Sequence, residues 1–320
     1  MAFPNITDIV ATTIERRSKT LADNVTKNNA LLAWLKSTGN VKTAPGGAKI
    51  FQEFLFAENG NFSWYNGYEP LNTGASDVIS GAEFAWKQAA APIMISGLEE
   101  LQNSGPDQMI DLMEGRVSAG EATMLNQISS ALYTDGSGSG GKAIQGLLGP
   151  IPADPTTGTY GGVDRSLWTF WRSQLQAPGA MTAATIQGNM NTLWAKCVRG
   201  TDRPKLILLD ANLWGLYMAS LQPLQRFTGA GEANLGFSTV KFMDADVVLD
   251  GGIGGFCPAN TGFFINPKYL FFRPHKDRNM VPLNPNRRVP FNQDASAQII
   301  GWAGNMTCSG AQFQGFLKGY

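Results

Sequence analysis

The residue pattern closest to a site of chemistry is a glycine-rich loop that runs from Gly136 to Ala143. Its glycines and Lys142 have the G-x-x-x-x-G-K spacing of a phosphate-binding loop, in which backbone N–H groups and the lysine hold phosphate oxygens. Position 143 is alanine, so the hydroxyl group that would ligate Mg²⁺ is missing. The loop also follows a predicted long helix, whereas the motif needs a preceding strand. We therefore interpret it as a glycine hinge.

A nucleophilic site or a zinc site would normally need histidine, and His275 is the only one in the chain. It lies in a charged segment at 273–278, where a surface histidine needs no special role. The three cysteines, Cys197, Cys257 and Cys308, have no zinc-site spacing and are odd in number. Their pattern is typical of small buried side chains in a reducing compartment. These residues predict no catalytic group, no metal and no cofactor.

Two pairs of acidic residues also favour structural roles. Neither Glu99 with Glu100 nor Asp244 with Asp246 has a further group that would make an acid–base pair, so we expect solvated or helix-capping positions. The glycine run at 251–255 is predicted to be a turn between strands, because no βαβ unit follows it.

The composition is that of a folded and electrically neutral protein. The chain has 320 residues, a formal net charge of +0 and 43% hydrophobic residues, which is enough apolar sequence for a sizeable core. A neutral balance argues against a general nucleic-acid binder. The basic residues Lys276, Arg278, Arg287 and Arg288 could face a phosphate polymer or an acidic neighbour, but alone they are a weak indication.

Neither a secretory signal nor a membrane span is predicted. Glu15, Arg16 and Arg17 interrupt any apolar region near the start of the chain. The longest uncharged apolar run, at 89–95, is far too short to cross a bilayer. We therefore expect synthesis in the cytoplasm and no membrane partner.

The stretch at 104–134 organises the rest of the chain. Its apolar residues recur at three- and four-residue steps, which is the period of one helical face. These residues are Met109, Leu112, Met113, Val117, Met124, Ile128 and Leu132. Pro106 and Asp107 suit the first turn of a helix, and Asp135 with Gly136 marks its end. The pattern predicts a helix over 105–134 that would reach roughly 40 Å and act as a strut.

Before this helix the sequence has the pattern of strands. Residues 49–57 alternate, with Ile50, Gln52, Phe54 and Phe56 on one side, and Asn59-Gly60 is a strong tight-turn sequence. A returning strand is predicted at 83–95, where Pro92 restricts its place in a sheet. Two long strands separated by about 25 loop residues predict a protruding arm rather than a compact sheet.

Four aromatic residues of this arm are our candidates for contact with another subunit: Phe62, Trp64, Tyr65 and Tyr68. An isolated two-stranded arm is marginally stable in water, so something must pack on it.

After the long helix, helical and strand patterns alternate. A helix is predicted at 182–199, a buried strand at 205–209, and a second helix whose start is capped by Asp210. From Thr239 onward strands dominate. This order predicts an α+β protein with two subdomains. Residues 1–38 leave two alternatives open, an arm that packs on something outside its own domain or ordinary helices of the core.

Four features in chain order carry a resemblance to a known family. Residues 94–104 resemble a passage from an arm strand through a short element into a spine helix. The predicted helix then ends at 131–139, the chain continues into Gln145-Gly-Leu-Leu-Gly149, and a helix–strand–helix segment follows at 182–222. In this order of elements the chain resembles the major capsid proteins of tailed bacteriophages, which have the Hong Kong 97-type fold.

The resemblance implies an α+β fold with a long spine helix, a projecting β-hairpin arm and a mixed α/β axial domain. Applied to this sequence, it gives an amino-terminal arm at 1–45, an extended β-hairpin arm at 46–95, a peripheral domain at 96–180 with the spine helix at 105–134, an axial domain at 181–270, and carboxy-terminal strands at 271–320 that return to the peripheral domain.

It also implies a structural head protein without enzymatic activity. Such a protein assembles as hexamers and pentamers into an icosahedral shell around phage double-stranded DNA, in the host bacterial cytoplasm, and ends in the virion. Its partners would be copies of itself and separate scaffolding, portal and decoration proteins, with DNA contacted non-specifically at most. The alternatives are an encapsulin-like compartment of the same fold and, less favoured, a phosphate-loop nucleotide-binding enzyme.

Overall fold

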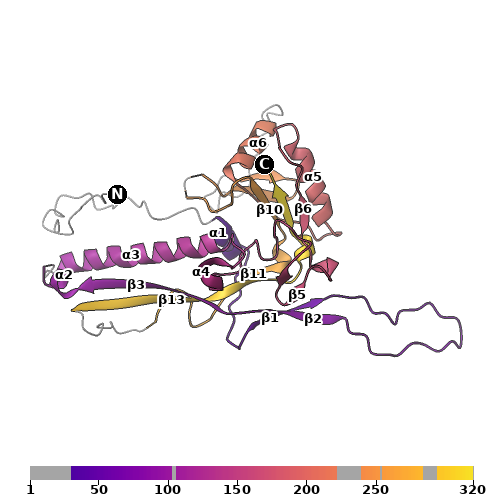
Figure 1. Ribbon diagram of the computed structural model, residues 1–320, viewed down its shortest axis with the longest axis horizontal. Coiled ribbons are helices and arrows are strands. Elements are labelled where there is room, and N and C mark those ends of the chain that lie inside the picture. The colour runs from indigo at the N-terminus through magenta and orange to yellow at the C-terminus, as the bar shows by residue number, and fades with distance from the viewer. Residues whose placement is uncertain (1–29, 103–105, 222–238, 253, 284–293, 320) are drawn as a thin grey trace.

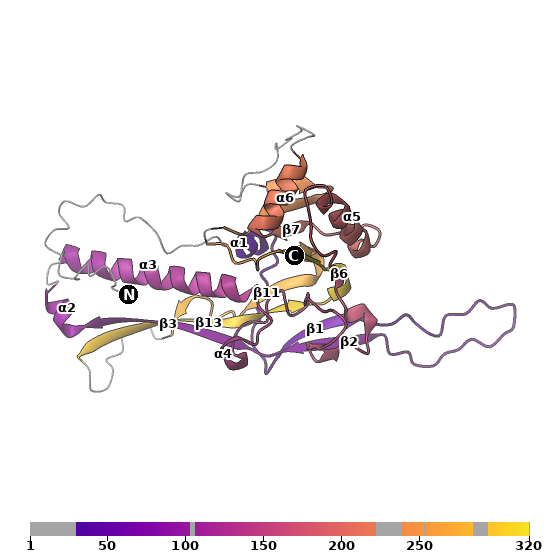
Figure 2. The ribbon, with the colours of Figure 1, turned by 45° about the horizontal axis from the view of Figure 1, so that its top comes forward.

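The computed structural model describes residues 30–102, 106–221, 239–252, 254–283 and 294–319; at 100–114 and 296 it describes the backbone alone. The molecule is elongated (Figure 1). A long helix and two long strands run side by side at one end, an α/β region stands above the middle, and a narrow arm projects from the other end. The same arrangement is visible in a view turned by 45° (Figure 2).

The long helix α3 (Pro106–Ala131) is the predicted spine. It begins at Pro106, whose fixed φ suits a first helical turn. It ends three residues before the predicted end at 134. The Tyr133 N–H donates to the Ser130 carbonyl oxygen (3.1 Å), and this i to i−3 bond tightens the chain into a 3₁₀-like turn.

The carboxy-terminal half of the spine buries the predicted apolar face. Met124 and Ile128 are each 4% exposed, Leu132 is fully buried, and Val117 packs at the margin of the same core. The other predicted apolar positions, Met109, Leu112 and Met113, lie where no side chain is described.

A four-stranded antiparallel sheet lies along the spine. It contains β3 (Lys87–Ser96), β11 (Leu270–Pro274), β12 (Val281–Pro282) and β13 (Ala295–Cys308). β13 pairs with β3 along the whole length of β3, from Lys87 opposite Gly304 to Ser96 opposite Ala295. Ile93 of β3 reaches the spine at Gly120, where an added Cβ would lie 3.0 Å from the isoleucine Cδ1. The missing side chain therefore allows helix and sheet to approach closely.

The returning strand expected at 83–95 is two strands, so that prediction was wrong. β2 (Ile79–Phe84) pairs with β1 (Ile50–Leu55), and β3 then leaves the arm to pair with β13. Between them, the Ala85 carbonyl oxygen accepts a hydrogen bond from Asn305 Nδ2 (2.9 Å), which fixes the backbone outside the ladder. Pro92 fits this place, because in the described residues β3 pairs with β13 alone and one edge needs no N–H donor.

The second sheet has six strands in the order β6-β14-β10-β7-β9-β8. They are β6 (Gln174–Gln176), β14 (Gly315–Lys318), β10 (Thr261–Ile265), β7 (Leu206–Leu209), β9 (Ala245–Leu249) and β8 (Thr239–Phe242). The helices α5 (Ile186–Cys197) and α6 (Ala211–Leu221) pack on this sheet. β14 was expected among the strands that return to the peripheral domain, but it lies here, because it pairs with β10 on one side and β6 on the other.

The predicted cap of α6 is confirmed. Asp210 Oδ1 accepts a hydrogen bond from the Leu213 N–H (3.0 Å) and Oδ2 accepts one from the Asn212 N–H (3.2 Å). The carboxylate thereby satisfies two of the free donors at the start of the helix.

The short helix α1 (Ala30–Ser37) decides one of the open alternatives for the start of the chain. Its residues Leu31, Leu32 and Leu35 are at most 4% exposed and belong to the same core as the spine and β13. This part is therefore an ordinary core helix, whereas residues 1–29 lie outside the described residues.

The remaining short elements are α2 (Gly97–Gln102), α4 (Gly138–Gly141), β4 (Thr159–Tyr160), β5 (Val163–Asp164), and the 3₁₀ turns η2 (Thr169–Trp171), η5 (Pro267–Tyr269) and η6 (Ala311–Phe313). Antiparallel and mixed sheets with segregated helices confirm the α+β class. No helix in the described ranges has both the length and the apolar character of a membrane span.

Candidate functional site: an exposed aromatic arm

The arm begins as a two-stranded ribbon that is packed on one face. β1 and β2 pair from Ile50 opposite Phe84 to Leu55 opposite Ile79. On the inner face, the Phe54 ring lies 4.7 Å from the Trp171 ring, and both side chains are buried. Beyond Leu55 the chain continues as a long loop that extends away from the body (Figure 1, Figure 2).

Asparagines hold the two sides of this loop together. The Asn72 side chain donates to Asn61 Oδ1 (2.8 Å), and Asn61 in turn donates to the Gly74 carbonyl oxygen. The predicted turn at Asn59-Gly60 is present, because the Phe62 N–H donates to the Asn59 carbonyl oxygen (3.3 Å). It does not reverse the chain, since Asn61 already faces Asn72.

The reversal falls instead at the second Asn-Gly pair, Asn66-Gly67. The Glu69 N–H donates to the Asn66 carbonyl oxygen (3.3 Å), and the Asn66 N–H donates to Glu69 Oε2 (3.1 Å). Gly67 has a φ of +57°, the left-handed region that glycine adopts most easily. The two sequence pairs are alike, so local sequence alone could not say which one forms the tip.

The four predicted contact residues lie on this loop and are strongly exposed. The exposed fractions are 72% for Phe62, 90% for Trp64, 63% for Tyr65 and 106% for Tyr68. The Phe62 and Trp64 rings contact each other edge to face, with centroids 5.5 Å apart. Large rings left in water by their own chain are typical of surfaces that a partner covers.

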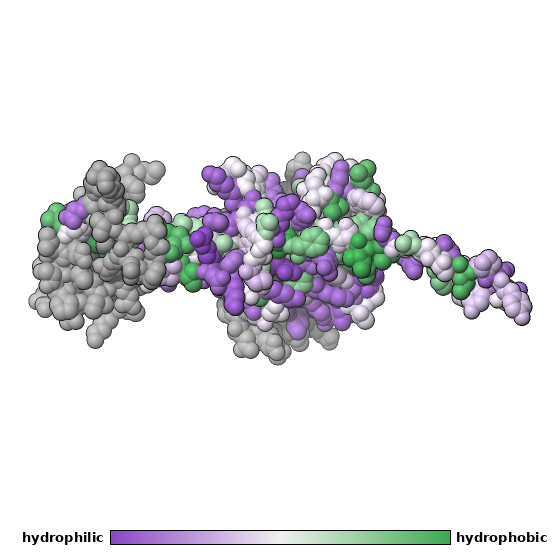
Figure 3. All heavy atoms as spheres, turned by 90° about the horizontal axis from the view of Figure 1, so that it is seen from below, coloured by the Kyte–Doolittle hydropathy of each residue, from purple (hydrophilic) through white to green (hydrophobic). Residues whose placement is uncertain are grey.

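Sequence reasoning missed a second exposed apolar group, on the outer face of the ribbon. Phe51, Leu55 and Ile79 are all more than half exposed. The Phe51 ring lies against Gly81, where an added Cβ would be 2.0 Å from the ring. The alternation of 49–57 already indicated this face, since Phe51 and Leu55 fall opposite the predicted inner residues. Figure 3 shows hydrophobic residues gathered where the arm leaves the body.

The residues considered for catalysis have structural surroundings. In the glycine loop, Asp135 Oδ1 accepts hydrogen bonds from the Ser137 N–H (2.9 Å) and hydroxyl (2.6 Å), and the loop closes into the single turn α4. Lys142 is exposed, and Lys87 Nζ donates to the Gly141 carbonyl oxygen. A phosphate-binding loop would instead direct a row of N–H groups and its lysine at one anion.

His275 and the cysteines are also accounted for by packing. The His275 ring lies edge to face with Trp86, at 5.2 Å between centroids, and its Nδ1 accepts from the Asp277 N–H (3.1 Å). The three thiols are free; Cys197 and Cys308 are buried and Cys257 is half-buried. Burial raises the pKa of each thiol to about 12, so none is poised as a nucleophile.

One member of each acid pair has a structural role, Glu99 as a capping residue and Asp244 in ion pairs. Glu99 and Ser96 form a capping box, in which the Ser96 N–H donates to Glu99 Oε2 (3.1 Å) and Ser96 Oγ accepts from the Glu99 N–H (3.3 Å). Asp244 forms ion pairs with Arg203 (2.8 Å) and Lys205. In the part of the chain that the structure describes, no group of three histidine, cysteine or acidic side chains could hold a metal ion.

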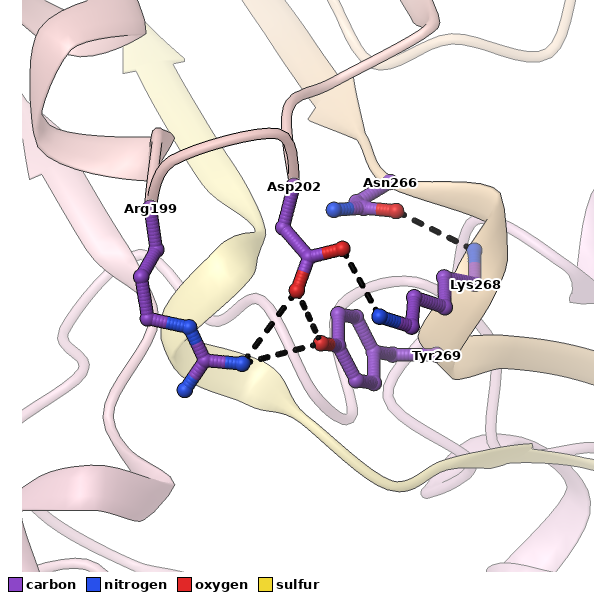
Figure 4. Close-up of polar contacts among 5 residues, drawn as sticks. All are labelled: Arg199, Asp202, Asn266, Lys268 and Tyr269. Carbon is purple, nitrogen blue, oxygen red and sulfur yellow. Dashed lines mark hydrogen bonds and ion pairs between the residues drawn. The ribbon is translucent and has the colours of Figure 1, made fainter.

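A polar cluster ties the turn after α5 to η5 (Figure 4). Asp202 accepts hydrogen bonds from Lys268 Nζ (2.8 Å), Tyr269 OH (2.7 Å) and Arg199 Nη2 (3.2 Å), and Asn266 Oδ1 accepts from the Lys268 N–H (3.1 Å). The Lys268 contact is the main cause that lowers the pKa of Asp202 to about 2. Its donors come from the same chain, so the cluster is a structural tie rather than a site that awaits a substrate.

Comparison of the whole structure with solved structures gives full-length likenesses. The capsid asymmetric unit of cyanophage A-1(L) matches with a TM-score of 0.65 and 16% identity, over 94% of this chain and 95% of that chain. The capsid of a native GTA particle gives 0.59 and 12%, over 100% and 99%. The SrpI encapsulin of Synechococcus elongatus PCC 7942 gives 0.55 and 10%, over 99% and 96%.

By sequence, no family model and no curated protein matches this chain. The likeness is therefore one of fold, and it extends from the arm through the spine to the last strand. This chain has the Hong Kong 97-type fold.

Proposed function

We propose that this chain is the major capsid protein of a tailed bacteriophage, which assembles with copies of itself into a closed shell. The observation that carries the proposal is the arm. Its rings are 63% to 106% exposed at the end of a narrow projection, in a fold whose solved examples include capsid subunits. The exposed rings at the end of such a projection add little to the core of their own subunit, but they can reach a neighbour.

The proposed assembly is an icosahedral shell of hexamers and pentamers that encloses phage double-stranded DNA. It would form in the host bacterial cytoplasm and become part of the virion. Its further partners would be separate scaffolding, portal and decoration proteins, and DNA would be contacted without sequence preference. Phe62, Trp64, Tyr65 and Tyr68 would act as contacts between subunits.

We also propose the domain division for this subunit. The amino-terminal arm covers 1–45, the extended hairpin arm 46–95, the peripheral domain with the spine 96–180, the axial domain 181–270, and the carboxy-terminal strands 271–320. In this scheme β3 is the part of 46–95 that anchors the arm in the body, because it pairs with β13. β14 is the part of 271–320 that belongs with the six-stranded sheet.

An encapsulin-like compartment is the second candidate, since the SrpI encapsulin has the same fold. It differs in cargo, because such a shell encloses protein instead of DNA. The phosphate-loop enzyme is disfavoured, since the solved neighbours named above are shell proteins and the glycine loop follows a helix.

Negative-stain electron microscopy of the purified protein tests the proposal. We expect closed angular shells, and dispersed monomers under every assembly condition would refute it. Shells isolated from infected or expressing cells would then be treated with nuclease and analysed for protected DNA and for co-purifying protein. Protected DNA supports the capsid, whereas a single enclosed protein without DNA supports the encapsulin-like compartment.

A further inference from the structure

The loop of the arm is acidic as well as aromatic. Between residues 56 and 78 the sequence contains Glu58, Glu69 and Asp77 but no lysine or arginine. All three carboxylates are exposed. Because the whole chain has a net charge of +0, the rest of the chain has an excess of three positive charges. A partner that covers the arm should therefore offer basic and aromatic groups together.

One such surface lies on the body of the molecule, at the start of β3. A shallow pocket of about 370 Å³ is lined by Gly46, Gly47, Trp86, Gln88, His275, Asp277, Arg278 and Ala303. We call it the Trp86 pocket. The Trp86 indole N–H donates to the Gly47 carbonyl oxygen (2.8 Å) and the ring contacts His275, so its aromatic wall is fixed.

Basic side chains lie in the Trp86 pocket and beside it. Lys276 and Arg278 are exposed on the turn that follows β11, and Arg278 Nη1 donates a long hydrogen bond to Gln88 Oε1 (3.4 Å). Next to this turn, Lys42 and Arg273 both lie against the Phe271 ring, at 4.3 and 5.7 Å from its centroid.

One acidic residue, Asp277, lines the pocket, and its backbone N–H donates a hydrogen bond to His275 Nδ1. It offsets only part of the positive charge of Lys276 and Arg278. The pocket and its surroundings thus combine an aromatic wall with cationic groups, which is the complement of the loop at 56–78.

We propose that the Trp86 pocket receives the tip of the arm from a second copy of this chain. In this contact Glu69 pairs with Arg278, and the Tyr68 ring packs against Trp86. The inference rests on the proposed function, because it assigns a surface to the neighbour that the arm would join. The arm of the same subunit does not fill this pocket, since in both ribbon views it extends away from β3 and β13 (Figure 1, Figure 2).

Charge reversal tests the pairing in assembled shells. Glu69→Lys alone and Arg278→Glu alone should each lower the yield of closed shells about tenfold or more, since a charge-assisted contact is lost and like charges are opposed. The double variant restores opposite charges at every contact, so it should recover most of the yield. Both residues are exposed, so unchanged melting of the subunits verifies that folding is intact. Full yield from each single variant, or no recovery in the double variant, would overturn the pairing.

Cysteine crosslinking tests the same contact without requiring a shell. In a chain with both Glu69→Cys and Arg278→Cys, diamide should oxidise thiol pairs between copies to disulfides, with its own reduction to the hydrazine, and give a ladder of oligomers on a non-reducing gel. The matched control combines Glu69→Cys with Ala219→Cys on the exposed face of α6, and it should give no ladder. The wild-type chain controls for Cys197, Cys257 and Cys308.

The two experiments separate the inference from the proposed function. Shells without the 69–278 ladder would overturn the pocket assignment and leave the capsid function standing. A ladder from concentrated protein that never closes shells would support the pocket and contradict the capsid function.

Discussion

Arg116 of the spine holds Glu99 of α2 through two parallel hydrogen bonds, with Nη1 2.9 Å from Oε2 and Nη2 3.0 Å from Oε1. The same carboxylate closes the capping box with Ser96 at the end of β3. One side chain therefore connects the turn between β3 and α2 to the long helix that packs on β3. The sequence pattern indicated Glu99 as a possible capping residue. Its ion pair with Arg116 joins residues 17 positions apart, and the sequence pattern does not predict how the intervening turn folds back.

The first prediction concerns the pH dependence of this ion pair. The hydrogen bond from Arg116 is the largest cause that lowers the pKa of Glu99 from 4.5 to about 2. A lowered carboxylate pKa stabilises the fold above the unfolded value, and this stabilisation is lost as the pH falls through the folded value. Glu99→Gln should thus destabilise by about 1 kcal/mol at neutral pH, and the difference should vanish between about pH 4.5 and 2.

Urea unfolding of both proteins as a function of pH measures this difference. Glu121→Gln, at an exposed position of the spine helix α3, is the matched control and should change the free energy of unfolding by less than about 0.5 kcal/mol. A Glu99→Gln penalty that persists at pH 2 would mean that packing, not charge, is responsible.

The second prediction concerns the core of the spine. Ile128→Ala should lower the free energy of unfolding by about 2–4 kcal/mol, because a side chain that is 4% exposed would leave a cavity. Ser118→Ala, on the exposed side of the helix, should have little effect. Equal stability of the two variants in denaturant unfolding would contradict the buried face.

The third prediction concerns a buried pair where the spine meets the six-stranded sheet. Tyr133 OH donates to Asp250 Oδ2, and the two side chains are 3% and 1% exposed. Burial raises the pKa of Asp250 above the unfolded pKa of 3.8. The contribution of this carboxyl group to stability is therefore most favourable below pH 3.8 and is lost as the pH rises through the higher pKa of the folded state. Tyr133→Phe removes the donor to the ionised form and should cost about 1–3 kcal/mol at neutral pH.

The penalty from Tyr133→Phe should shrink as the pH is lowered below the raised pKa of folded Asp250, because the buried carboxyl group is then protonated and has no negative charge to be stabilised by a donor. Thermal or urea unfolding at several pH values measures it. A penalty that is constant with pH would show that Asp250 keeps one protonation state throughout.

The sequence predicted the periodic elements well and the connections poorly. The apolar stripe from Val117 to Leu132 and the cap at Asp210 are local patterns, so they could be found without a structure. The split between β2 and β3 could not, because β formers continue through 83–95 and only the partners differ: β1 for one strand and the distant β13 for the other. Strand pairing depends on contacts far apart in the sequence.

The candidate site shows the same division. Composition identified the aromatic residues of the arm, and the structure shows them exposed, but the tip at Asn66-Gly67 was not separable from Asn59-Gly60. The Trp86 pocket joins residues from four separate parts of the chain, at 46–47, 86–88, 275–278 and 303. No spacing within the sequence indicates such a surface.

The fourth prediction concerns the glycine loop. Because Ala143 lacks the hydroxyl group for Mg²⁺ and Lys142 is exposed, ATP should bind no tighter than about millimolar. ATP hydrolysis should not exceed background. Equilibrium dialysis with Lys142→Ala as the paired variant measures binding, and a micromolar signal that this substitution abolishes would revive the enzyme alternative.

The last prediction concerns the arm and is the most direct test of the proposed function. Trp64 and Tyr65 are 90% and 63% exposed, so Trp64→Ala with Tyr65→Ala should leave the melting of the unassembled subunit nearly unchanged. The same double variant should block closed shells, because aromatic contacts at an interface typically contribute about 2 kcal/mol or more each. Each subunit repeats the loss around the lattice, so the effect multiplies.

The matched control is Phe54→Ala, an aromatic truncation at the root of the same arm. Phe54 is 9% exposed and packs on Trp171 within its own subunit, so this variant should lower the melting temperature itself and cost about 3–5 kcal/mol. Paired melting and electron microscopy of the two variants distinguish the roles. Normal shells from the double variant would show that the rings are dispensable. A free subunit that unfolds as readily as Phe54→Ala would show that the rings belong to the subunit core. Either result would contradict the proposal that the arm joins subunits.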